Sequence, residues 1–259
     1  MAIIPVNGAT LRVRCDGDRS RPTVVLSNSL GTDLSMWDAQ AAVLATRFHV
    51  LRYDTRGHGG SSAPPGPYTI AQLGADVLAL LDHLDIARAH VVGLSMGGVI
   101  AQWLGVHAPG RIQKLVLANT ASQIGTREGW QARAAAVRAE GMDAIAAGSP
   151  ARWFTPDFVA RQPVVVGAMQ KTVRGLDPEG YAACCEALAA ADLSQDLHRI
   201  RVRTLVIAGA EDPVTTLADA QALAGAIAGA ALASLPASHL SNVEAPDRFS
   251  DAVASFLLA

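Results

Sequence analysis

Residues 90–98 read His-Val-Val-Gly-Leu-Ser-Met-Gly-Gly. The run up to Leu94 is apolar, as in a buried strand, and the chain from 96 to 108 is apolar nearly all round, as in a helix covered on several sides. Ser95 therefore lies in a Gly-x-Ser-x-Gly pattern at a sharp strand-to-helix turn, where glycines make room for a strained backbone. This context predicts that the Ser95 hydroxyl projects from the carboxyl end of a sheet, beside the free N–H groups of a helix N-terminus.

Short apolar runs alternate with longer helical patterns on both sides of this turn. We expect strands at 11–15, 23–27, 50–53, 90–94, 112–118, 204–208 and 232–235, and helices at 69–85, 96–108, 216–228 and 247–258. Strands that alternate with helices indicate βαβ units. The predicted fold class is therefore α/β, with a mostly parallel, doubly wound sheet.

The chain from 121 to 195 breaks this alternation. It is rich in alanine, and its one strand-like run, 164–166, is equally compatible with a helix. We therefore expect a helical lid over 121–195, inserted between two strands of a core that consists of 1–120 and 196–259. No repeat or low-complexity linker suggests that the lid folds independently.

A serine hydroxyl is a weak nucleophile and needs a base that takes its proton. Among the seven histidines, His239 lies in the loop after the last expected strand, which in a doubly wound sheet projects toward the same edge as Ser95. His58 precedes the serine, which is the wrong order for a hydrolase with the chain order serine, acid, histidine. The other five histidines fit structural or solvated positions. We predict His239 as the base.

A carboxylate is needed to orient the imidazole and to stabilise its charged form. Asp212 follows the expected strand 204–208, so the lid precedes the strand that carries this acid. Its neighbour Glu211 is excluded, because a shift of one residue turns the carboxylate elsewhere and Pro213 fixes the turn just after Asp212. The alternative position for the acid, after the preceding strand, is occupied by Asn119, which has no carboxylate.

Two backbone N–H groups are expected to stabilise the negative oxygen of a tetrahedral intermediate. One belongs to Met96, the residue after the nucleophile. We assign the other to Leu30, in the loop that follows the buried strand 23–27.

Together these motifs resemble the α/β-hydrolase superfamily: Ser95, Asp212 and His239 carry the likeness, with the segment Tyr-Asp-Thr-Arg-Gly-His-Gly at 53–59. More narrowly, the chain resembles the 3-oxoadipate enol-lactonases of the β-ketoadipate pathway over essentially its whole length. The narrower likeness rests on SNSLGT at 27–32, WxxR at 130–133, WFTP at 153–156, GYAACC at 180–185 and HLSNVE at 239–244.

The resemblance implies hydrolysis of 3-oxoadipate enol-lactone to 3-oxoadipate, in the bacterial breakdown of aromatic compounds, without a metal or an organic cofactor. The lactone carries a carboxylate, and a buried carboxylate without a partner is costly. Arg133 shares a helix face with Trp130, and its guanidinium can bind a carboxylate with two hydrogen bonds. We predict Arg133 as the anchor of this anionic lactone, with Trp130 and Trp153 as further candidates for the pocket wall.

The triad leaves several activities open. A carboxylesterase, a carbon–carbon bond hydrolase of a ring-cleavage pathway and a perhydrolase all use the same three residues. A ligand receptor on a hydrolase scaffold can also retain them. Dehalogenases and epoxide hydrolases of this fold are disfavoured, because they need a carboxylate nucleophile where Ser95 stands.

Composition narrows the class of protein. The 259 residues are 50% hydrophobic and 17% charged, which argues against disorder, and the formal net charge of −2 lacks the basic excess of a nucleic-acid-binding protein. No long apolar run or leader segment is evident, so we expect a cytoplasmic protein that does not enter a membrane. Three cysteines provide no disulfide framework and no zinc spacing. Whether the protein is a monomer or a homodimer stays open.

Overall fold

The computed structural model describes all residues 1–259. Its strands are β1 (Ala2–Val6), β2 (Ala9–Asp16), β3 (Thr23–Ser27), β4 (His49–Tyr53), β5 (Ala89–Leu94), β6 (Ile112–Ala118), β7 (Arg203–Gly209) and β8 (Ala231–Leu235). Its α-helices are α1 (Asp38–Leu44), α2 (Ile70–His83), α3 (Met96–His107), α4 (Arg127–Glu140), α5 (Asp143–Trp153), α6 (Pro156–Arg161), α7 (Pro163–Arg174), α8 (Pro178–Ala189), α9 (Leu217–Ala226), α10 (Ser241–Glu244) and α11 (Pro246–Leu258).

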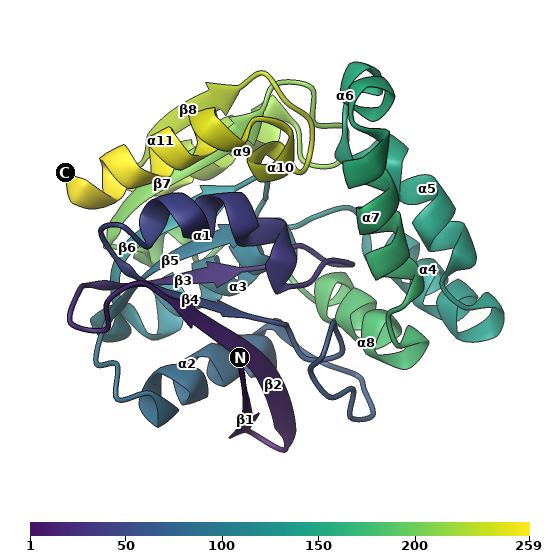
Figure 1. Cartoon of the computed structure of the whole chain (residues 1–259), viewed down its shortest axis with the longest axis horizontal. Helices are drawn as coiled ribbons and strands as arrows, with labels where there is room; N and C mark the ends of the chain where they lie inside the picture. Colours follow the sequence, from purple (N-terminus) through teal and green to yellow (C-terminus); the bar gives the residue numbers. More distant parts are fainter.

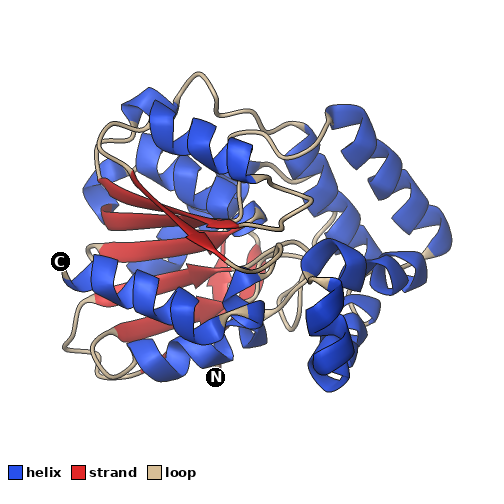
Figure 2. Cartoon of the chain, turned by 90° about the horizontal axis from the view of Figure 1, so that it is seen from above, coloured by secondary structure: helices blue, strands red, loops and turns tan.

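The eight strands form one sheet in the order β1-β2-β4-β3-β5-β6-β7-β8. Only the pairings β1–β2 and β2–β4 are antiparallel, and the other strands run parallel. Helices cover both faces of the sheet (Figure 2). The predicted α/β class with a mostly parallel, doubly wound sheet is confirmed.

Burial explains why the central strands were recognisable from their sequence. Every residue of β3, β4 and β5 is buried, as expected for parallel strands with both faces covered. Helix α2 buries one stripe, which includes Leu73, Val77 and Leu80, whereas α3 is buried nearly all round. Helix α3 begins at Met96, directly after Ser95, so the turn that carries Ser95 rests on a buried helix.

Outside the lid, β1, α1 and the four-residue helix α10 were not predicted, and one ambiguity is resolved. Strand β1 is a short edge strand that contains Pro5, and α1 has only seven residues, so neither shows a clear period. The run 164–166 belongs to the helix α7, which begins at Pro163. Proline is well tolerated there, because the backbone N–H that it lacks would have no acceptor within the helix.

Between β6 and β7 the chain forms the five helices α4 to α8, which lie together at one end of the sheet (Figure 1). Helix α4 packs on α8 and α5 packs on α7. On α4, the guanidinium of Arg138 forms ion pairs with Glu179 and Glu186 of α8. We keep the name lid for residues 121–195.

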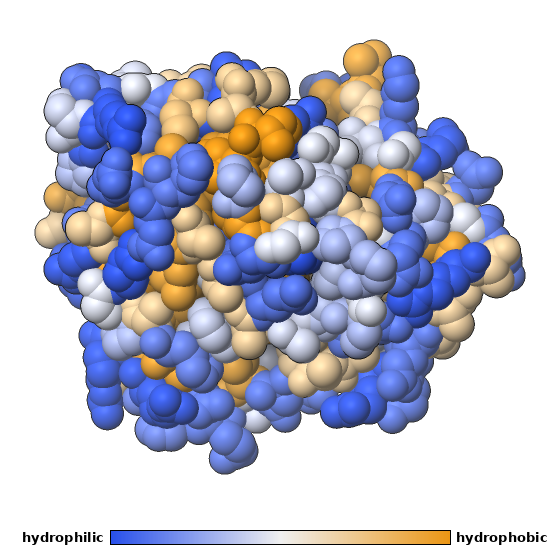
Figure 3. All heavy atoms as spheres, turned by 90° about the horizontal axis from the view of Figure 1, so that it is seen from below, coloured by the Kyte–Doolittle hydropathy of each residue, from blue (hydrophilic) through white to orange (hydrophobic).

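The face of the molecule in Figure 3 is mostly hydrophilic, with a connected group of hydrophobic side chains in its upper central part. The large hydrophobic residues that are exposed are Met1, Ile3, Val43, Val164, Leu232 and Leu258. None of the helices combines the length and the apolar character that crossing a membrane requires.

The lid and the core approach each other closely where α8 begins. A Cβ atom added to Gly180 would lie 2.5 Å from the Cα atom of Gly57, which is in the turn after β4. Gly57 itself has a φ of +78°, so both positions require glycine. The backbone of the lid therefore rests directly on the backbone of this turn.

We predict that Gly180→Ala lowers the free energy of unfolding by about 1–3 kcal/mol, because the added methyl group forces two backbones apart. The control is Gly167→Ala in α7, where a Cβ would meet no atom within 4 Å. That change should raise stability by up to about 1 kcal/mol through helix propensity. Urea denaturation of the two variants measures the difference, and equal midpoints would contradict the close approach.

Candidate active site

Ser95 occupies the turn between β5 and α3 with φ +57° and ψ −117°, a conformation that is strained for a residue with a side chain. The flanking glycines are required by close contacts. A Cβ on Gly93 would lie 2.1 Å from the carbonyl oxygen of Gly97, and a Cβ on Gly97 would lie 2.1 Å from that of Ser27. The Gly-x-Ser-x-Gly pattern therefore allows strand, turn and helix to pack without intervening side chains.

The structure brings the three residues of the predicted triad together. The Nε2 atom of His239 lies 2.9 Å from the Ser95 Oγ atom, and its Nδ1 atom lies 2.8 Å from the Oδ2 atom of Asp212. The three come from the ends of β5, β7 and β8, which meet at one edge of the sheet. All three residues are buried, with exposed fractions of 2–6%.

Asp212 is held in its ionised form. Burial disfavours the charge, but the hydrogen bond and charge of His239, with hydrogen bonds from Asn119 and Thr215, outweigh it and lower the pKa of Asp212 to about 2. Because this pKa lies below its ordinary value of 3.8, ionised Asp212 stabilises the fold above pH 3.8. That contribution is lost as the pH falls through about 2.

The proposed oxyanion donors lie on two connected segments. The N–H of Met96 is at the first position of α3, where the helix has no carbonyl to accept it. The N–H of Leu30 has no hydrogen-bond acceptor within the protein. The Gly97 N–H donates to the carbonyl of Asn28 at 2.9 Å, which ties the Leu30 loop to the turn at Ser95.

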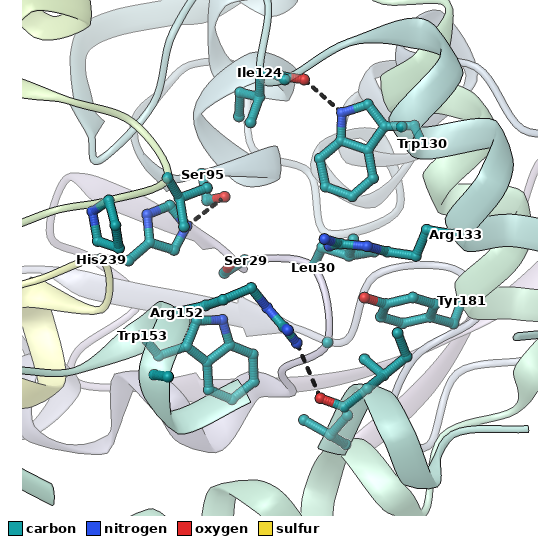
Figure 4. A pocket seen from close by; sticks show the side chains of 18 of the residues that line it. Ser29, Leu30, Ser95, Ile124, Trp130, Arg133, Arg152, Trp153, Tyr181 and His239 are labelled. Atoms are coloured by element: carbon teal, nitrogen blue, oxygen red, sulfur yellow. Dashed lines mark hydrogen bonds between the residues drawn. The ribbon is translucent and has the colours of Figure 1, made fainter. Parts of the chain in front are cut away.

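Ser95 and His239 face a cavity of about 410 Å³. Its core wall includes Leu30 and Val214, and its lid wall includes the three predicted substrate-binding residues Trp130, Arg133 and Trp153 together with Ile145, Arg152, Val173 and Tyr181. Figure 4 labels Leu30, Trp130, Arg133, Arg152, Trp153 and Tyr181 among the side chains around the cavity. No Asp or Glu lines it.

Two arginines give the lid wall its charge. The guanidinium carbon of Arg133 lies 4.7 Å from the centre of the Trp130 ring, and in Figure 4 the side chain lies between Trp130 and Tyr181. Arg152 donates a hydrogen bond to the carbonyl of Ile145 at 3.0 Å. Burial and the positive charge of Arg133 lower the pKa of Arg152, so the pocket holds two partly buried cations.

A family model described as "alpha/beta hydrolase fold" matches residues 22–246. The chain belongs to the α/β-hydrolase fold family. It is 52% identical over 237 residues to "3-oxoadipate enol-lactonase 2" of Acinetobacter baylyi, covering 92% of this chain and 89% of that one. It is 42% identical over 253 residues to "3-oxoadipate enol-lactonase 1" of the same organism, covering 96% and 94%. The crystal structure of the enol-lactonase from Burkholderia xenovorans is similar over the full length of both chains, with a TM-score of 0.98 and 50% identity.

Sequence reasoning missed three polar residues in and around the site of this α/β hydrolase. Asn119, noted only for lacking a carboxylate, donates hydrogen bonds to Asp212 and to the carbonyl of Ser238. Glu244 accepts from the N–H of Ser238 at 2.9 Å and from Thr155 in the lid, so it connects the His239 loop to the lid. Arg152 is the second positively charged side chain on the lid wall, beside Arg133. The sequence shows Asn119 directly after the expected strand 112–118 and Glu244 at the end of the HLSNVE run, but it does not show their hydrogen-bond partners.

We predict that Asp212→Asn lowers kcat by roughly 10⁴-fold, the loss produced by the same change in serine proteases, because an amide cannot stabilise the imidazolium. The matched control is Glu211→Gln, whose side chain is exposed next to it. That variant should keep kcat within about threefold of the unmodified enzyme, since surface changes have small effects. Steady-state kinetics on one ester substrate compares the two variants. Similar losses of kcat in both would show that Asp212 is not the acid that orients His239.

Proposed function

We propose that this α/β hydrolase opens the ring of 3-oxoadipate enol-lactone, with Ser95 as nucleophile, His239 as general base and Asp212 as the acid that orients it. The observation that carries the proposal is the cavity above Ser95, whose lid wall has two arginines and no acidic residue. Such a cavity favours a small anionic substrate. The relatives named as enol-lactonases support the same substrate.

Acylation follows from the hydrogen bonds of the site. The Ser95 Oγ atom attacks the lactone carbonyl while its proton passes to the Nε2 atom of His239. The N–H groups of Met96 and Leu30 stabilise the oxyanion. When the tetrahedral intermediate collapses, the ring carbon–oxygen bond breaks, and the imidazolium returns the proton to the enol oxygen.

The ring opening creates a requirement that a simple ester does not have. The enol formed stays covalently attached to the acyl group on Ser95, so it can attack the acyl carbon again and re-form the lactone. Conversion of the enol to its ketone removes this internal nucleophile. Water, activated by His239, then hydrolyses the acyl-enzyme and releases 3-oxoadipate, and Ser95 regains its proton.

Arg133 is proposed to bind the carboxylate that the lactone already carries. Its guanidinium lies over the Trp130 ring on the lid wall, which limits its freedom and directs it along the cavity. A pairing of guanidinium and carboxylate with two hydrogen bonds also orients the lactone carbonyl toward Ser95.

We predict that Ser95→Ala abolishes hydrolysis of the enol-lactone, with a loss on the order of 10⁴–10⁶ in kcat, and leaves the fold intact. The measurement is steady-state turnover of the enol-lactone and of p-nitrophenyl butyrate, together with the thermal midpoint. If the unmodified enzyme hydrolyses p-nitrophenyl butyrate but not the enol-lactone, the proposed substrate is refuted. Turnover near the original rate in folded Ser95→Ala protein would refute the nucleophile.

We predict that Arg133→Gln lowers kcat/KM for the anionic lactone by roughly 10–100-fold, the effect of losing a charged hydrogen bond. A neutral lactone of similar size should change less than threefold. Arg152→Gln is the comparison variant within the same wall. A selective loss in Arg152→Gln alone would transfer the anchor to that residue, and equal losses on both lactones would exclude Arg133 as the anion site.

A further inference from the structure

His58 is a buried histidine that the triad does not use. It lies in the turn after β4 with 1% of its surface exposed. In the sequence its position before Ser95 excluded it as the base, which left its buried ring without a role. Its contacts in the structure lead to the loop that carries one of the proposed oxyanion donors.

The ring of His58 accepts a hydrogen bond from the backbone. Its Nε2 atom lies 3.0 Å from the N–H of Gly31. Because an amide nitrogen can only donate, Nε2 must be unprotonated, and the ring proton is on Nδ1, 3.4 Å from the carbonyl oxygen of Arg56. Burial lowers the pKa of His58 to about 4, so the ring is neutral and able to accept at neutral pH.

This hydrogen bond holds the chain on one side of Leu30. The Gly31 N–H belongs to the peptide plane that follows Leu30. On the other side, the carbonyl of Ser29 accepts hydrogen bonds from the N–H and the hydroxyl of Thr32, at 3.3 and 2.8 Å. The carbonyl of Ser29 and the N–H of Leu30 share one planar peptide group and point in opposite directions. Both peptide planes around Leu30 are therefore fixed.

The hydrogen bond to His58 is the only one that the Gly31 backbone forms within the protein. Its φ is +88°, and a Cβ added there would lie 3.3 Å from the Trp153 ring and 3.6 Å from that of Tyr181. A glycine lacks a side chain that could hold the loop, so the position of its N–H depends on the acceptor. His58 is that acceptor.

The lid packs on the other side of the imidazole. The sulfur of Cys184 in α8 lies 3.9 Å from the Nδ1 atom, and the Tyr181 ring centre lies 6.2 Å from that of His58. The adjacent backbone contact between Gly57 and Gly180 leaves no space for the turn to shift toward the lid. The imidazole is thus held between α8 and the Leu30 loop.

We propose that His58 is a positioning residue for the oxyanion hole: by accepting the Gly31 N–H, it keeps the Leu30 N–H directed at the carbonyl that Ser95 attacks. The inference rests on the proposed serine-nucleophile chemistry. It is independent of the lactone as substrate, because an oxyanion hole serves every acyl transfer at Ser95.

The test removes the hydrogen-bond acceptor at position 58 while it keeps a side chain of similar volume there. His58→Phe fills the site but cannot accept a hydrogen bond, whereas His58→Gln offers a carbonyl oxygen near the position of Nε2. The control is His90→Phe, the same substitution at a buried histidine of β5, near the amino end of that strand and away from the site. Each variant is assayed with the enol-lactone and with p-nitrophenyl butyrate, and its thermal midpoint is recorded.

Loss of an oxyanion donor costs about 10²–10³-fold in kcat, and a displaced donor costs less. We expect His58→Phe to lower kcat by about 10–100-fold on both substrates, with KM within about threefold. His58→Gln should recover most of that loss, and His90→Phe should keep kcat. If only the ester is turned over, the lactone assignment fails, but the ester data still test His58.

An alkylboronic acid separates positioning from general destabilisation. Ser95 adds to the boron and forms a tetrahedral anion, one oxygen of which occupies the oxyanion hole. The inhibition constant should rise in His58→Phe by about the same factor by which kcat falls. A folded His58→Phe enzyme with unchanged kcat, or one with reduced kcat and unchanged boronate affinity, would overturn the proposal. Equal losses in His58→Gln and His58→Phe would also overturn it.

Discussion

The backbone of Ser95 is held at φ +57° and ψ −117° between a fully buried strand and a helix that begins at the next residue. A side chain in such a conformation costs on the order of 1–3 kcal/mol, which the surrounding packing must offset. The backbone around Ser95 is packed closely: at Gly93 and Gly97 even a methyl group would collide with a neighbouring backbone segment. This constraint lifts the hydroxyl clear of the sheet and leaves the Met96 N–H free beside it.

The other parts of the site are attached to this turn by hydrogen bonds. The Gly97 N–H fixes the loop that contains Leu30, and the Ser95 N–H donates to the end of β6 at the carbonyl of Ala118. The next residue, Asn119, reaches both Asp212 and the loop of His239. A small set of polar contacts thus holds Ser95, His239, Asp212 and the Leu30 loop in one arrangement. Because these hydrogen bonds are made within the protein itself, they preorganise the groups that can stabilise a transition state.

The lid provides one wall of the cavity and also part of this framework. Its arginines Arg133 and Arg152 face a cavity that no Asp or Glu lines. Trp153 lines the same cavity, and its carbonyl accepts the N–H of Leu240, the residue after His239. Helix α8 packs on His58 in the turn behind the Leu30 loop. Changes in the lid are therefore expected to reach the catalytic groups as well as the substrate.

Local motifs made much of the fold and of the candidate site predictable from the sequence. The turn at Ser95 and the strand ends that carry Asp212 and His239 are recognised from adjacent residues, because a parallel sheet brings its strand ends to one edge. The spacing of Arg133 from Trp130 predicted a place in the pocket, and Arg133 lines the cavity. The contact of His58 with Gly31 and the entry of Arg152 into the cavity depend on how distant segments pack, and no pattern along the chain reports that packing.

The central claim is that this network activates Ser95, and covalent labelling tests it most directly. A fluorophosphonate reacts with a serine that has an aligned base and an oxyanion hole, and with ordinary serines hardly at all. The account predicts one phosphonyl group per chain, located on Ser95 by peptide mass mapping, and hydrolytic activity that disappears in proportion to labelling. Full activity after complete labelling, or an adduct on any other residue, would contradict it.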